Sequence, residues 1–201
     1  MDASLEHVHE EHVHELEPYV RIGRARAATI MFILSDVLAV FAIMAAGGYL
    51  KALNTESQYK IAGDHPLTFV PGLVVAIVLV LSGLFYFLWE RRVRANDGVG
   101  PTAFFGLSLL CVVVALVAQI WAALSLGYTT MPYHAYESVL MIITWYTWVH
   151  FLLLLILGVL LLGRILRGRL VGFSFIPEVM GYWWYYTVLS ALLLWGFSYI
   201  L

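Results

Sequence analysis

Few side chains in the long apolar segments of this sequence can bind a ligand or carry charge. Asp36 lies inside one apolar run and His150 inside another, and Glu137 lies near the start of the second run. An ionisable group in apolar surroundings is costly, so it marks a structural pair or a functional site. Asp36 could therefore hold a lipid headgroup, pair with another helix, or lie on a proton route.

A second group of polar residues forms a repeated pattern at the N-terminus. The segments His7-Val8-His9-Glu10 and His12-Val13-His14-Glu15 place four imidazoles among carboxylates. Such tracts can bind Zn²⁺ or Cu²⁺, which makes His7, His9, His12 and His14 candidate metal ligands. A solvated tail without a metal is the more common outcome for a short segment of this kind.

The chain has few other side chains that could bind a metal or catalyse a reaction. Cys111 is the one cysteine, and His150 is the one histidine within the long apolar runs. Haem, copper and iron sites draw on several such ligands. No Gly-rich nucleotide loop, nucleophile elbow or HExxH pattern occurs. We therefore expect no catalytic residue, no cofactor bound by this chain and no nucleic-acid partner.

The composition indicates an integral membrane protein. Of 201 residues, 62% are hydrophobic and 12% are charged, whereas soluble domains carry about 25% charged residues. Five apolar runs are long enough to cross a bilayer as helices. They cover about 27–50, 69–89, 102–126, 135–163 and 179–201. The predicted fold is an all-α bundle of five transmembrane helices.

The distribution of charge predicts domain organisation and orientation. Residues 1–25 form an acidic, His-rich tail, expected to be disordered at its start, and residues 26–201 form the membrane domain. All nine arginines fall on one side of the predicted spans, which the positive-inside rule assigns to the cytoplasm. The N-terminus is then cytoplasmic and the C-terminus lies on the outer, periplasmic side. These arginines are Arg21, Arg24, Arg26, Arg91, Arg92, Arg94, Arg164, Arg167 and Arg169.

Small residues recur at helical spacing in the first predicted span. Ser35, Ala39, Ala42 and Ala46 share one face of that helix. Small side chains allow membrane helices to approach closely. Internal packing of the bundle is the simpler interpretation, and a docking face for a partner subunit is the alternative.

Three segments resemble subunit III of the haem-copper oxidases. The first span reads MFILSDVLAVFAIMAAGGYL (residues 31–50), similar to the family's FLxSE/D followed by AxYxL. The fourth reads YESVLMIITWYTWVH (136–150), similar to YGSxFFxxTGxHGxHV, and the last reads EVMGYWWYYTVL (178–189), similar to YWHFVDVVW. Thr147, Trp184 and Thr187 stand where the family has His, His and Asp. The five-span layout matches the short form of this subunit.

This resemblance implies a non-catalytic subunit of a prokaryotic respiratory oxidase that reduces O₂ to water and pumps protons. Haem and copper are expected in partner subunits, and phospholipid is a candidate ligand of this chain. The implied partners are catalytic subunit I, subunit II, a small subunit IV or a larger supercomplex, and membrane lipids. Asp36, His150 and Glu137 are the implied lipid or subunit contacts. The implied location is the bacterial or archaeal plasma membrane.

Two alternatives remain open at this level. An accessory protein of a nitric oxide reductase would keep the fold and change the substrate of the complex. A small membrane transporter or metal-handling protein would instead use the His-rich tail. The electron donor, cytochrome c or quinol, is not recorded in residues of a subunit that does not bind it.

Overall fold

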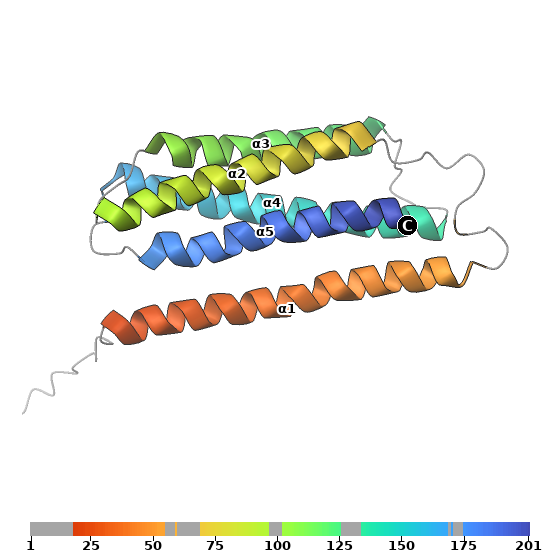
Figure 1. The fold of residues 1–201 in the computed structure, drawn as a ribbon, viewed down its shortest axis with the longest axis horizontal. Helices are drawn as coiled ribbons and strands as arrows, with labels where there is room; N and C mark the ends of the chain where they lie inside the picture. Colours follow the sequence, from red (N-terminus) through yellow and green to blue (C-terminus); the bar gives the residue numbers. More distant parts are fainter. Residues whose placement is uncertain are drawn as a thin grey trace, which may run out of the picture.

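The computed structural model describes residues 18–54, 59, 69–96, 102–125, 134–168, 170 and 175–201. The described part of the chain is built from α1 (Pro18–Ala52), α2 (Phe69–Asn96), α3 (Thr102–Ser125), α4 (Ala135–Leu166) and α5 (Phe175–Ile200). The helices lie side by side, and each runs antiparallel to the one before it (Figure 1). The all-α prediction is confirmed.

The five helices do not contribute equally to the bundle. Helices α2 and α4 each contact both α3 and α5, so these four form a closed group. Helix α1 packs from outside, and among the described residues it contacts only α4 and α5 (Figure 1). Any residue that couples α1 to the bundle must therefore reach α4 or α5.

Four helices are long and apolar enough to cross a membrane. They are the segments Tyr19–Ala52, Phe69–Ala95, Thr102–Leu124 and Ala135–Leu166. Their outward faces carry large apolar side chains such as Leu38, Val117 and Val149, each at least 60% exposed. An apolar surface of this extent is stable in lipid and unstable in water. The chain is a multi-pass membrane protein.

Helix α5 differs from the other four in composition. It supplies Trp183, Trp184, Tyr185 and Tyr186 in succession, and it is not one of the four described helices that are long and apolar enough to cross a membrane. These aromatic residues pack inward, since Trp184 is fully buried and Trp183 is nearly so. This aromatic-rich helix lies against α1, α2 and α4.

Several helix ends lie beyond the apolar runs that predicted them. Helix α1 begins at Pro18 rather than near residue 27, so the predicted boundary at residue 26 falls inside a helix. Helix α2 continues to Asn96, past the expected end at 89. The added turns carry arginine, which ends an apolar run without ending a helix, because helical hydrogen bonds are made by the backbone.

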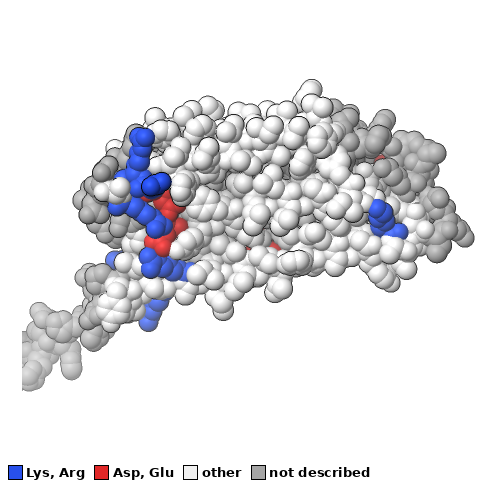
Figure 2. All heavy atoms as spheres, in the orientation of Figure 1, with Lys and Arg blue, Asp and Glu red and all other residues white. Residues whose placement is uncertain are grey.

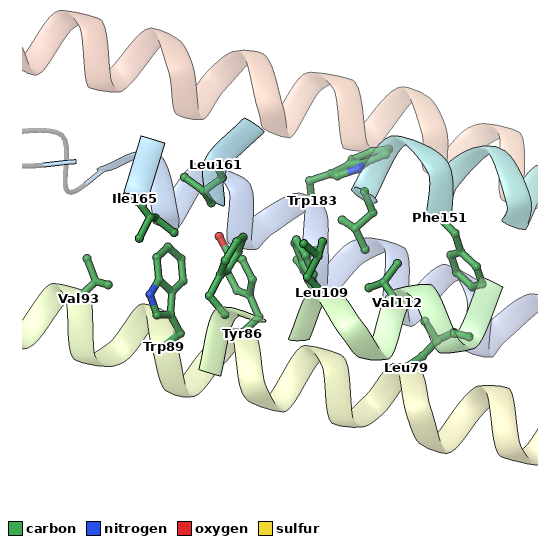
Figure 3. Close-up of a cluster of buried hydrophobic side chains, with 14 of the residues drawn as sticks. Leu79, Tyr86, Trp89, Val93, Leu109, Val112, Phe151, Leu161, Ile165 and Trp183 are labelled. Carbon is green, nitrogen blue, oxygen red and sulfur yellow. The ribbon is translucent and has the colours of Figure 1, made fainter. Parts of the chain in front are cut away.

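The core is a layer of aromatic and aliphatic side chains between α2, α3, α4 and α5. The Tyr86 and Trp184 rings stack with centroids 4.6 Å apart, and Phe105 contacts both. Figure 3 shows Tyr86 and Trp89 directed from α2 toward Leu161 and Ile165. The Tyr86 hydroxyl donates to the Pro177 carbonyl at 2.8 Å, so its polar end is paired inside this core.

A reciprocal pair of serines joins α2 to α3 within the same layer. Ser82 Oγ donates to the Ser108 carbonyl at 2.9 Å, and Ser108 Oγ donates to the Ser82 carbonyl at 2.7 Å. Trp184 Nε1 also donates to Ser82 Oγ at 3.0 Å. Small hydroxyl residues that bond to a facing backbone allow membrane helices to pack closely.

Gly72 marks a close approach of α2 to α5. A Cβ atom at this position would lie 2.0 Å from Trp195 Nε1 and 2.9 Å from the Tyr199 hydroxyl. The indole is itself held by ring contacts with Phe69 at 5.7 Å and Tyr199 at 5.4 Å. Only glycine fits here without moving a rigid side chain.

We therefore expect Gly72→Ala to lower the free energy of unfolding by about 1–3 kcal/mol, the usual cost of overpacking. Denaturant-induced unfolding in detergent micelles would measure the change. Gly106→Ala is the matched control, because nothing lies within 4 Å of an added Cβ there. Equal effects of the two substitutions would contradict the close contact.

Candidate functional site

Asp36 and His150 meet between α1 and α4. The distance from His150 Nε2 to Asp36 Oδ2 is 2.9 Å, and the two side chains are 9% and 17% exposed. The two residues are 114 positions apart in the chain. The structure thus joins the ionisable residues of the first and fourth apolar runs into one polar cluster.

Two tyrosines complete this cluster. Tyr146 lies one turn before His150 on α4, and its hydroxyl donates to Asp36 Oδ2. The Tyr186 hydroxyl of α5 lies 3.4 Å from that of Tyr146. Trp183 stacks on the His150 imidazole, with ring centroids 5.5 Å apart. One carboxylate oxygen is therefore the centre of contacts that join three helices.

The hydrogen bonds constrain the protons of this cluster. His150 Nδ1 lies 2.7 Å from the Tyr146 carbonyl oxygen, which can only accept, so Nδ1 carries a proton. Nε2 faces an Asp36 oxygen, and that contact is favourable only with a proton between the two atoms. Whether this proton is assigned to Asp36 or His150, the pair has no net charge. A neutral pair is the form that apolar surroundings favour.

This arrangement is suited to fastening a helix and to holding one proton between two groups. The carboxylate oxygen of Asp36 is already occupied by donors from Tyr146 and His150. No cluster of three or more His, Cys, Asp or Glu side chains suited to a metal occurs in the described part of the chain. The candidate metal ligands His7, His9, His12 and His14 lie outside the described residues.

Glu137 does not belong to this cluster. It lies in the first turn of α4, 13 residues before His150, a separation of about 20 Å along a helix. A carboxylate in the first turn of a helix is stabilised by the helix dipole. Its position indicates a role at the end of α4 rather than at the Asp36 site.

The small-residue stripe of α1 lies on the outside. Ser35, Ala39, Ala42 and Ala46 are all exposed, so they do not pack within the described part of the chain. Val40 and Gly47 are buried instead, on the face toward α4 and α5. Internal packing is thus not the role of the stripe, because the apolar residues between its members form the contact. The docking-face alternative stays a prediction.

A second polar cluster, which the sequence analysis did not identify, lies where the arginines gather (Figure 2). Arg26 of α1 donates to Glu178 of α5 at 2.7 Å, and Arg94 of α2 lies 3.8 Å from the same carboxylate. Arg94 also pairs with Glu90, which is only 6% exposed and accepts from Tyr185 at 2.5 Å. These contacts tie α1, α2 and α5 together at one end.

The sequence carried only weak signals for Tyr146, Tyr186 and Glu90, which the sequence analysis did not select as site residues. Tyr146 and His150 share a helix face because they are four positions apart, as are Glu90 and Arg94. Tyr186 belongs to an unbroken aromatic run in α5, where spacing gives no reason to select one ring over another. Its place beside Asp36 depends on how α5 packs against α1.

Comparison with known proteins identifies no family for this chain. No protein-family model matches this chain, and no curated protein matches it. The grounds for a function are therefore the sequence resemblance and the site geometry.

We expect Asp36 and His150 to be energetically coupled. Asp36→Ala and His150→Ala should each destabilise the protein by about 1 kcal/mol or more, since each leaves a polar partner unpaired. The double variant should lose less than the sum, by about 0.5–2 kcal/mol. Unfolding of all three variants in micelles measures this coupling.

Ser35→Ala is the control for that cycle, because Ser35 is adjacent to Asp36 in the chain and is exposed. It should leave stability within about 0.5 kcal/mol of the parent. Strictly additive losses for Asp36 and His150 would show that the two side chains do not interact.

Proposed function

We propose that this chain is the non-catalytic subunit III of a prokaryotic haem-copper respiratory oxidase. The observation that carries the proposal is the contact between Asp36 and His150. The sequence selected these two residues as ionisable groups in separate apolar runs, both runs also carry segments that resemble the family, and the two side chains are hydrogen-bond partners. The contact brings polar positions of two of the resembling segments together, as the proposal expects, although any two ionisable groups in an apolar bundle also gain by pairing.

In this proposal the fifth helix also crosses the bilayer. Helix α5 lies alongside the four membrane-capable helices and is of similar length (Figure 1). The described arginines occupy one end of the bundle, which becomes the cytoplasmic end by the positive-inside rule (Figure 2). The C-terminus then lies on the outer side of a bacterial or archaeal plasma membrane.

The proposed role is structural support of catalysis elsewhere. Haem and copper belong to subunits I and II, and this chain packs on subunit I to support assembly, lipid binding and sustained proton uptake. The exposed stripe Ser35, Ala39, Ala42 and Ala46 suits a close helix–helix contact with that partner. The neutral cluster around Asp36 fixes α1, which presents the stripe, on the rest of the chain.

Purification from native membranes tests the proposal directly. A mild-detergent pull-down of the tagged chain should yield an eluate with haem absorption bands and a large subunit rich in histidine, identified by mass spectrometry. The haem type and the reactivity with O₂ or nitric oxide separate an oxidase from a nitric oxide reductase. A colourless chain without partners would overturn the proposal and favour a transporter or metal-handling protein.

Bulky substitutions in the stripe test how the partner is bound. Ala39→Leu and Ala42→Leu should leave the stability of the isolated chain unchanged, because both sites are exposed. They should reduce co-purified haem by about tenfold or more, since closely packed helices cannot accept the added atoms. Ala103→Leu, at an exposed site on α3, is the matched control. Equal haem recovery from all variants would exclude the stripe as the docking face.

A further inference from the structure

The end of the bundle where α1 begins carries a large excess of positive charge. The described arginines at the start of α1 and at the ends of α2 and α4 are Arg21, Arg24, Arg26, Arg91, Arg92, Arg94, Arg164 and Arg167. The described carboxylates among them are Glu90 and Glu178, and Arg94 and Arg26 pair with these. Eight arginines and two carboxylates leave a net charge of +6 on the described part of this end (Figure 2).

Three of these arginines line a groove of about 1020 Å³. The groove lies between the start of α1, the end of α4 and the start of α5, with Arg21, Arg164 and Arg167 on its walls. Apolar side chains, including Leu157 and Leu160, form the rest of its lining. An occupant that matches this surface must combine several negative charges with apolar groups.

The chain itself contains a segment of that chemistry. Residues 1–17 lie outside the described residues and lead directly into α1 at Pro18, three positions before Arg21. Their acids are Asp2, Glu6, Glu10, Glu11, Glu15 and Glu17, with no Lys or Arg, and Leu5, Val8, Val13 and Leu16 are interspersed. A side-chain charge of −6 therefore adjoins a surface of +6.

The length of residues 1–17 and their covalent attachment to α1 both favour their binding in this groove. Seventeen extended residues span up to about 55–60 Å, several times the 8–10 Å between packed helix axes. A short tether also gives its end an effective concentration in the millimolar range. A dissociation constant of about 1 mM is then enough to keep the segment bound for much of the time.

We propose that residues 1–17 fold back and dock in the groove of Arg21, Arg164 and Arg167. The acidic side chains pair with the arginines, and the interspersed Leu and Val side chains cover Leu157 and Leu160. The docked segment neutralises this end of the protein and excludes other anions from the groove, lipid phosphates included. This inference goes beyond the proposed function and requires no partner subunit.

Limited proteolysis of the full-length chain tests this docking. The chain is placed in nanodiscs of neutral phosphatidylcholine and exposed to a glutamate-specific protease at low ionic strength. Cleavage within residues 1–17 should be at least about tenfold slower than in the free 1–17 peptide, because only undocked molecules are cut. In 1 M salt, where the screening length falls to about 3 Å, cleavage should approach the peptide rate.

Paired variants locate the docking site. Arg164→Gln with Arg167→Gln should bring cleavage close to the peptide rate, with unchanged helical circular dichroism as the check on folding. Arg91→Gln with Arg92→Gln removes the same charge from α2, outside the groove, and should retain protection. Equal acceleration by both pairs would overturn the groove in favour of diffuse attraction to the arginine end.

Two further outcomes overturn the proposal. Cleavage of the parent chain at the peptide rate in neutral nanodiscs would show that the segment does not dock. Protection that disappears when the nanodiscs contain anionic phosphatidylglycerol would show that lipid headgroups occupy the groove in a charged membrane. Protection that persists in both membranes is the expected result.

Discussion

The attachment of α1 to the other four helices is the constraint that decides which face of this helix remains exposed. The other four helices contact one another in a closed group, whereas among the described helices α1 touches only α4 and α5. Polar contacts hold it at three levels: Arg26 on Glu178, Asp36 on His150, and Lys51 on the Ile200 carbonyl. The middle contact lies in apolar surroundings, where no water competes for its hydrogen bonds. The outer face of α1 is thereby fixed and remains exposed.

The chemistry of the middle contact explains how an acid is accommodated in an apolar segment. The Tyr146 carbonyl fixes the tautomer of His150, and one proton then lies between His150 and Asp36. The assembly is neutral, so its burial avoids the cost of an isolated charge. Such a pair contributes position and specificity to the fold.

At the arginine end of the bundle, some charged side chains pair with each other and others are exposed. At the arginine end, Glu90 and Glu178 are enclosed by Arg26, Arg94 and tyrosine hydroxyls, so the acids are satisfied within the chain. The arginines in excess of these acids lie at the surface, where anions can reach them. The internal pairs therefore stabilise the junction of α1, α2 and α5, and the remaining described arginines lie exposed with no carboxylate partner among the described residues.

The sequence by itself determined the helical class, the membrane environment and the approximate spans, because apolar run length and arginine placement are local properties. It also selected Asp36 and His150, since an ionisable residue in an apolar run is conspicuous without a structure. Only the tertiary structure decided that these two residues meet, because their contact spans 114 positions and depends on how α1 packs on α4. The rotation of α1 about its axis likewise placed Ala39 and Ala42 outside, since an apolar helix in lipid has no polar face to fix which side turns inward.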